Sequence, residues 1–160
     1  MKHVIFIRHA SAMPGQFPAR DFERELDASG LQEAAALGVF MAGKLEKPEI
    51  LLFSPAARTA KTAMILNNHL NIPKEHLRPE LKLYNCHFQT LIHAIQSVDN
   101  QFASLAIVAH NPGISQSAAL LSSGAAFQLA PAAAVCLAFS SDDWSGIRPG
   151  RGKEIWYFNP

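Results

Sequence analysis

The chain has 160 residues, of which 49% are hydrophobic, and its 14 basic and 13 acidic side chains leave a formal net charge of +1. These values predict one folded domain over residues 1–160, and the scattered, nearly balanced charge argues against nucleic acid as a partner. The longest apolar run, residues 132–139, is too short to cross a membrane, and the chain shows no secretory signal, so we expect a cytoplasmic protein.

The first predicted element is a buried strand that ends at two residues suited to anion chemistry. Residues 4–7 are consecutive apolar residues, three of them β-branched, and Arg8 and His9 follow directly. In open α/β sheets, ligands bind beyond the carboxyl ends of the strands. We therefore expect an anion site with a nucleophile or base here, although a single Arg-His pair is also compatible with a solvated strand end.

A connection and a helix follow this strand. Residues 13–26 predict an irregular connection, because they combine proline and glycine with alternating charges. Asp27 or Ser29 is expected to cap a helix that runs to about Leu45, with Gln32 completing a capping box from Ser29. The apolar and small residues expected to face the sheet are Leu31, Ala34, Ala35, Gly38, Met41 and Leu45.

The second unit repeats the order of strand and helix. Residues 50–53 predict a short buried strand, Ser54 is expected to cap the next helix, and Pro55 suits its first position. This helix should continue to about Leu70 and carries Arg58 near its start. An arginine beside the positive end of a helix is unfavourable unless an anion binds there, so Arg58 also indicates an anion site.

The third unit and the end of the chain complete the pattern. The expected elements are a connection at 72–79, a brief strand or extended loop at 81–84, a helix at 88–98, a strand at 105–109, a helix from 114 to about 122, and strands at 132–139 and 154–158. The strand at 105–109 runs directly into His110. The last two strands are expected to form a hairpin-like edge.

These elements predict an α/β fold with three layers, in which helices cover both faces of a mostly parallel sheet. Parallel strands would bring Arg8, His9, Arg58 and His110 together at one edge. We expect no carboxylate in this set. That expectation, with the absence of an HExxH motif, predicts a site without metal or other cofactor.

Two arginines and two histidines suit phosphoryl transfer. Guanidinium groups bind tetrahedral oxyanions through paired N–H donors. His9 can attack phosphorus only as a neutral imidazole, and the nearby arginines should lower its pKa. A backbone carbonyl that binds one ring nitrogen would leave the other free to attack. The sequence therefore predicts a covalent phosphohistidine on His9, which water then hydrolyses.

The motifs resemble those of the histidine phosphatase superfamily, and most closely its small SixA-type phosphohistidine phosphatases. The RHG signature appears as RHA at 8–10, the SPxxRxxxT block as SPAARTAKT at 54–62, and the GHNPG block as AHNPG at 109–113. The DFxRPLxxxG and LYxA segments appear as DFERELDASG at 21–30 and LYNC at 83–86. The resemblance extends over essentially the whole chain.

The resemblance implies a phosphoglycerate mutase-like fold and a role for each matched residue. His9 would be the phosphorylated nucleophile, and the phosphate pocket, which would hold a phosphate or sulfate ion, would consist of Arg8, Arg58 and His110. Arg24 would lie at its rim, although Glu25 replaces the family's proline and an ion pair is an equal alternative for Arg24. Ser11 and Asn111 are the remaining residues expected to bind substrate or phosphate.

The sequence also bears on the substrate. Many superfamily members have an acid after the second helix to protonate an alcohol leaving group, whereas here Glu80 is the nearest candidate and is expected to be an exposed loop charge. The missing acid favours phosphohistidine, on a protein such as a histidine phosphotransfer domain, as the substrate of a metal-independent phosphatase. The alternatives are a phosphatase for sugar phosphates or nucleotides, and a non-catalytic phosphate-binding regulatory module.

Overall fold

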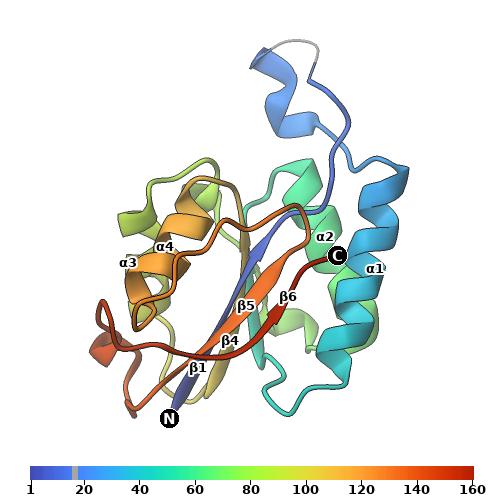
Figure 1. Ribbon diagram of the computed structural model, residues 1–160. Helices are drawn as coiled ribbons and strands as arrows, with labels where there is room; N and C mark the ends of the chain where they lie inside the picture. The colour runs from blue at the N-terminus through green and yellow to red at the C-terminus, as the bar shows by residue number, and fades with distance from the viewer. Residues whose placement is uncertain (16–17) are drawn as a thin grey trace.

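The structure is a computed structural model that describes residues 1–15 and 18–160, so residues 16 and 17 of the predicted irregular connection lie outside the described residues. A six-stranded sheet in the order β3-β2-β4-β1-β5-β6 forms the middle layer (Figure 1). The strands are β1 (Lys2–Arg8), β2 (Ile50–Phe53), β3 (Leu77–Pro79), β4 (Ser104–Ala109), β5 (Ala134–Phe139) and β6 (Lys153–Phe158).

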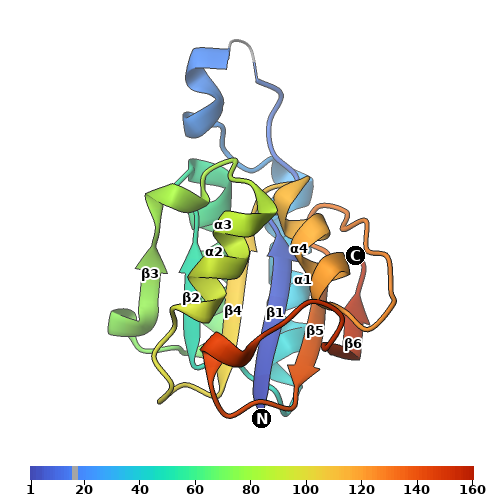
Figure 2. The ribbon, with the colours of Figure 1, turned by 90° about the vertical axis from the view of Figure 1, so that its left-hand side faces the viewer.

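Helices cover both faces of this sheet, as predicted. The helices are α1 (Ala28–Ala42), α2 (Ala57–Leu70), α3 (Phe88–Gln96) and α4 (Gly113–Leu121), and the short 3-10 helices are η1 (Pro18–Glu23), η2 (Lys74–His76), η3 (Leu81–Leu83) and η4 (Trp144–Gly146). Helices α1 and α2 pack on one face, and α3 and α4 pack on the other (Figures 1 and 2). No helix in the described part of the chain is long and apolar enough to cross a membrane.

The sheet is mostly parallel, and its register aligns the strand ends. Strand β1 pairs in parallel with β4, which pairs in parallel with β2. The last pair along β1 and β4 is Arg8 opposite Ala109, so His9 and His110 leave the sheet at the same level. Strand β5 runs antiparallel to both β1 and β6, which confirms the hairpin-like edge at the end of the chain.

Alternation along the strands divides the core into two layers. On β1, Val4 and Phe6 belong to the cluster under α3 and α4, whereas Ile5 and Ile7 belong to the cluster under α1 and α2. All four side chains are fully buried. The strand is thus buried on both faces, as its continuous apolar run predicted.

The segment between β1 and α1 projects beyond the carboxyl edge of the sheet (Figures 1 and 2). Its two ends are joined where Ala12 pairs with Leu26 and where the Met13 N–H donates to the Glu25 carbonyl at 2.8 Å. Helix η1 lies within this segment, although residues 19–26 were expected to be loop. Because the segment folds back on itself, it brings η1 over the ends of the strands.

Helix α1 differs from the prediction in its limits and in part of its buried face. Asp27 is the N-cap and accepts a hydrogen bond from the Gly30 N–H at 2.7 Å, so the capping box from Ser29 does not form. The helix ends at Ala42, and Leu45, which was expected to be buried, is 96% exposed. Leu31 is also exposed, whereas Leu37 fills the core in its place.

Two other segments differ from the sequence-based expectation. Helix α2 starts at Ala57 with Ala56 as its N-cap, so Ser54 does not cap the helix and Pro55 precedes its first turn. The connection at 72–79 contains β3, a short edge strand beside β2. Residues 81–83 form a 3-10 helix instead of a strand.

Candidate active site

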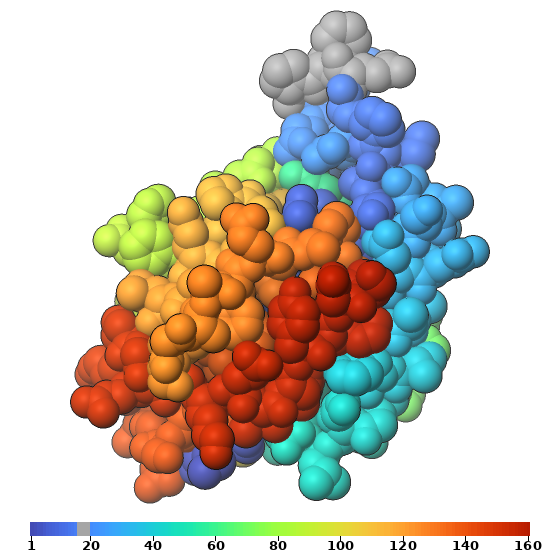
Figure 3. All heavy atoms as spheres, in the orientation of Figure 1, coloured from blue at the N-terminus to red at the C-terminus, as the bar shows by residue number. Residues whose placement is uncertain are grey.

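The carboxyl ends of β1, β2 and β4 open into a pocket of about 520 Å³ beneath the projecting segment. In Figure 3, early residues of the chain (dark blue) reach the surface between the loop after α4 (orange) and the projecting segment. The pocket is lined by Arg8, His9, Ser11, Ala12, Asp21, Arg24, Asp27, Arg58, Asn85, His110, Asn111 and Pro131. Every residue expected at the site from the sequence is in this set, whereas Glu80 is not part of the described lining.

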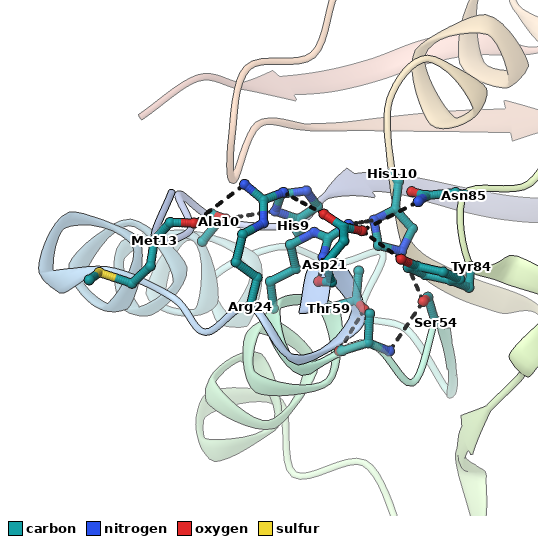
Figure 4. Close-up of polar contacts among 12 residues, drawn as sticks. His9, Ala10, Met13, Asp21, Arg24, Ser54, Thr59, Tyr84, Asn85 and His110 are labelled. Carbon is teal, nitrogen blue, oxygen red and sulfur yellow. Dashed lines mark hydrogen bonds and ion pairs between the residues drawn. The ribbon is translucent and has the colours of Figure 1, made fainter. Parts of the chain in front are cut away.

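His9 sits at the end of β1 with one ring nitrogen bound to the backbone. Its Nδ1 lies 2.7 Å from the Ala10 carbonyl oxygen (Figure 4). A carbonyl only accepts, so Nδ1 carries the proton and Nε2 keeps a free lone pair. Burial lowers the pKa of His9 to about 4; the Ala10 hydrogen bond opposes this shift, and the charges of the nearby arginines reinforce it. The predicted lowering is present, but burial is its largest cause.

His110 follows β4 and is fixed in the opposite tautomer. Arg58 donates to its Nδ1 at 3.2 Å, which makes Nδ1 the acceptor. The proton therefore lies on Nε2, which is 2.9 Å from the Ser54 hydroxyl oxygen. Burial, followed by the charge of Arg58, lowers the pKa of His110 to about 3. The His9 and His110 rings lie 5.4 Å apart, so two neutral imidazoles face the same pocket.

Arg58 is almost completely buried and is held by the projecting segment. Its guanidinium donates to the Asp21 carbonyl at 2.7 Å and to the Asp21 carboxylate at 3.0 Å. The same carboxylate accepts a hydrogen bond from the Tyr84 hydroxyl at 2.6 Å. Figure 4 shows Asp21 between Arg24 on one side and Tyr84 and Asn85 on the other. Asp21 is thus the residue through which η1 is attached to the site.

Asp21 and Asp27 both line the pocket and correct the expectation that no carboxylate belongs to the site. The hydrogen bond from Tyr84 and the contacts with Arg58 and Arg24 lower the pKa of Asp21 to about 2, although its partial burial opposes the shift. Asp21 is therefore ionised at neutral pH and carries no proton to donate. Within the described residues, no group of three or more His, Cys, Asp or Glu side chains could hold a metal ion.

Three arginines line the pocket and each has an unpaired donor. Other nitrogens of these groups bind within the protein: Arg8 Nη1 donates to the Leu129 carbonyl at 3.1 Å, and Arg24 Nη2 forms an ion pair with Asp21 at 3.2 Å. In the described part of the chain, the buried Nε atoms of Arg8, Arg24 and Arg58 have no hydrogen-bond partner. All three arginines line one pocket, and guanidinium groups bind oxyanions through their N–H donors, so this pocket suits an oxyanion. Arg24 lines the pocket and also forms an ion pair, so both of the expectations for this residue apply.

Ser11 and Asn111 line the pocket, but their polar groups also have partners in the protein. The Ser11 hydroxyl donates to the Glu33 carboxylate at 2.9 Å. The Asn111 amide donates to the Leu129 carbonyl at 2.9 Å and accepts from the Ser115 hydroxyl at 2.6 Å. These contacts fix the loops that carry both residues, and a direct role in substrate binding stays a prediction.

The sequence interpretation missed the roles of Asp21, Tyr84 and Ser54 in the site. Asp21 and Tyr84 are separated from the strand ends by long connections, so no strand or helix pattern places them there. The available signal was the resemblance, because Asp21 begins one of the matched segments and Tyr84 lies in another. Ser54 was interpreted as a helix cap, a role that its position between β2 and Pro55 favours locally.

Similarity to known proteins is found at the level of structure. No protein-family model and no curated protein matches the sequence. A provisionally named phosphohistidine phosphatase SixA from Agrobacterium tumefaciens superposes with a TM-score of 0.84 at 22% identity, over 99% of this chain and 98% of that chain. The protein histidine phosphatase SixA complexed with tungstate gives a TM-score of 0.80 at 23% identity, over 97% and 95% of the two chains.

The same fold also occurs in a phosphatase with a different substrate. A mycobacterial glucosyl-3-phosphoglycerate phosphatase in complex with VO3 superposes with a TM-score of 0.71 at 14% identity, over 98% of each chain. These matches confirm the predicted three-layer, phosphoglycerate mutase-like fold. Because the identities are low and the substrates differ, the choice of substrate rests on the chemistry of the site.

Proposed function

We propose that the protein is a metal-independent phosphohistidine phosphatase, which removes the phosphoryl group from a histidine of another protein. The observation that carries this proposal is that His9, whose Nε2 is free, lies in one pocket with Arg8, Arg24 and Arg58. The neutral imidazole supplies the nucleophile, and the guanidinium groups match the charge of the equatorial phosphoryl oxygens. The neutral His110 ring lies beside Arg58 in the same pocket.

The reaction takes place in two displacements. The substrate phosphoimidazole is protonated on its other ring nitrogen; His9 Nε2 attacks phosphorus while the P–N bond breaks, and the substrate ring leaves as neutral imidazole. Water then attacks the phosphorus on His9, loses a proton, and releases phosphate with restoration of the neutral His9 ring. In both steps the arginines stabilise the phosphoryl oxygens, whose charge changes most in the transition state.

The state of Asp21 favours phosphohistidine over a simple ester. An alkoxide needs a proton in order to leave, whereas a protonated phosphoimidazole departs as neutral imidazole. Asp21 has a pKa of about 2 and so cannot supply that proton at neutral pH. Glu80 forms an ion pair with Lys82 at 3.7 Å, away from the pocket lining. The expected substrate is therefore a phosphohistidine protein, such as a histidine phosphotransfer domain, in the cytoplasm.

A phosphatase for small phosphate esters is the second candidate, because a sugar phosphatase shares this fold. The deciding experiment compares kcat/KM on a phosphorylated histidine phosphotransfer domain with kcat/KM on sugar phosphates, whose alkoxide leaving groups need a proton. We expect a preference of at least roughly a hundredfold for the phosphoprotein, because Asp21 is ionised at neutral pH and cannot donate to an alkoxide. A preference for any of the esters would refute the substrate assignment.

The covalent step is tested by trapping. Rapid acid-free quenching after mixing with labelled substrate should leave an acid-labile phosphoryl label on the wild-type protein and none on His9→Ala. The His9→Ala variant should lose turnover while Arg8 and Arg58 still bind phosphate, and the exposed His93→Ala should behave as wild type. Turnover by His9→Ala would rule out the covalent mechanism. If wild-type protein bound phosphate without turning over any substrate, it would be a binding module.

A further inference from the structure

The peptide group between Ala10 and Ser11 connects the nucleophile to a carboxylate on α1. Its carbonyl oxygen accepts the His9 Nδ1 proton at 2.7 Å (Figure 4). Its N–H donates to the Glu33 carboxylate at 3.1 Å. In a planar trans peptide the carbonyl and the N–H point in opposite directions. Any group that fixes the N–H therefore also fixes the direction of the carbonyl that faces His9.

Further hydrogen bonds immobilise the backbone on both sides of this peptide. The Ser11 hydroxyl also donates to Glu33, at 2.9 Å, so two groups of Ser11 bind one carboxylate. The Ala10 N–H donates to the Thr62 hydroxyl at 3.1 Å, and that hydroxyl donates to the Arg58 carbonyl at 2.7 Å. Thr62 thus ties the Ala10 backbone to α2, while Glu33 ties Ser11 to α1.

We propose that Glu33 is a positioning residue for His9, which acts through the Ala10–Ser11 peptide to hold the His9 ring with its proton on Nδ1 and its lone pair on Nε2. The hydrogen bonds that link Glu33 to His9 do not depend on the proposed phosphatase function. Their consequence for catalysis rests on that function. In this arrangement the carboxylate, the peptide and the imidazole form one chain of donors and acceptors.

A carboxylate suits this position for an electrostatic reason. Hydrogen bonds to an ionised acceptor are about twice as strong as neutral ones, and linked hydrogen bonds polarise one another. The negative charge on the N–H side therefore makes the carbonyl a stronger acceptor for His9 Nδ1–H. The other charged or titratable groups of the pocket act directly across it, whereas Glu33 acts through the peptide; they are Arg8, Asp21, Arg24, Asp27, Arg58 and His110.

The tautomer of His9 can be measured in the free protein by 15N NMR of labelled histidine. Wild-type protein should show a protonated Nδ1 and an unprotonated Nε2 for His9. In Glu33→Ala we expect a substantial Nε2–H population, which is the form that free imidazole side chains favour when no acceptor holds Nδ1–H. Glu33→Gln keeps an acceptor oxygen, so it should restore part of the wild-type signal and serves as the test if Glu33→Ala does not fold.

Kinetics provide the second readout. We expect kcat to fall about tenfold to a hundredfold in Glu33→Ala, in line with other losses of groups that orient a functional histidine, and less in Glu33→Gln. KM should change less than about threefold, because the arginines of the pocket are untouched. The acid limb of the pH profile of kcat should also shift to lower pH, because the hydrogen bond to Ala10 raises the pKa of His9 and would be weakened.

Glu49 offers a matched control. Its carboxylate also accepts a backbone N–H, from Ala103 at 2.6 Å, at the other end of the sheet. Glu49→Ala should therefore lower thermal stability without changing kcat or the His9 signals. If Glu33→Ala behaved in the same way as Glu49→Ala, the positioning role would be refuted. A tautomer change in protein that turned over no substrate would support this inference while refuting the proposed function.

Discussion

At the scale of single residues, His9 and His110 make the protein sensitive to acid. Burial lowers their pKa values from 6.5 to about 4 and about 3, so in this range the unfolded chain binds more protons than the folded protein. Stability therefore rises with pH up to about 6.5 and falls as the pH drops below that value. The stability that depends on the neutral rings is complete above the unfolded pKa of 6.5 and is lost progressively as the pH falls toward 3.

This linkage predicts that the free energy of unfolding changes measurably with pH. Two extra protons on the unfolded chain contribute about 2.5 kcal/mol per pH unit to the free energy of unfolding near pH 5. Replacing His110 by Gln should remove about half of that slope, as measured by urea unfolding at a series of pH values. His93→Gln, at an exposed position, should leave the slope as in wild type. If the free energy of unfolding changed equally steeply with pH in His110→Gln and in wild type, the assignment of half of this pH dependence to His110 would be contradicted.

At the scale of secondary-structure elements, the start of α1 supports the loop after the nucleophile. Gly30 lies in the first turn of α1, and a Cβ there would collide with the Ser11 carbonyl oxygen. That oxygen also accepts the Asp27 N–H at 3.1 Å, so the loop and the helix start are joined by both packing and hydrogen bonding. The close approach of this backbone requires glycine, and it explains why α1 contributes to the site although Gly30 contacts no substrate group.

We therefore expect Gly30→Ala to lower kcat at least tenfold, because the loop must shift and moves the Ala10 carbonyl away from His9. Gly38→Ala is the control in the same helix, since its Cβ would meet the His69 side chain instead of the site. Both variants should lose about 1–3 kcal/mol of stability from overpacking, measured by chemical denaturation. Gly38→Ala should keep kcat within about threefold, and an equal loss of kcat in both variants would contradict this role of α1.

The sequence predicted the helices and strands well where the apolar runs and the spacing of apolar residues indicate the same element. The buried strands at β1, β2 and β4 and the helices after them were predicted because their apolar runs are continuous and each ends at a polar group. Leu31 was assigned to the wrong face because Leu37 lies at a spacing that fits helical periodicity equally well, and Leu45 is exposed because α1 ends at Ala42. Asp21 was missed because its position depends on the Ala12–Leu26 pairing, a tertiary contact without a local pattern.

At the scale of the whole molecule, the pocket collects groups from four separate parts of the chain. Arg8, Arg24, Arg58 and His110 come from β1, the projecting segment, α2 and the end of β4. An anion bound by all four connects segments that are otherwise joined mainly through the sheet. Ligand binding should therefore stabilise the folded protein as a unit, since only the folded state assembles the site.

Inorganic phosphate or tungstate should accordingly raise the melting temperature. At a concentration of about a hundred times Kd, binding adds about 2.7 kcal/mol, which corresponds to roughly 5–10 °C for a chain of this size. Differential scanning calorimetry should show this shift in wild type and in Arg151→Ala, whose arginine is exposed elsewhere on the surface. Arg58→Ala should show a much smaller shift, and a full shift in that variant would place the anion outside this pocket.

The central place of β1 in the sheet has a consequence for biosynthesis. Strand β1, which ends next to His9, pairs with residues 104–109 on one side and 134–139 on the other. At about 5–20 residues per second, the ribosome finishes residue 139 roughly 7–26 s after residue 8. During that interval an apolar segment of the nascent chain has no permanent neighbour. The sheet can therefore close around β1 only late in translation, after β5 has been made.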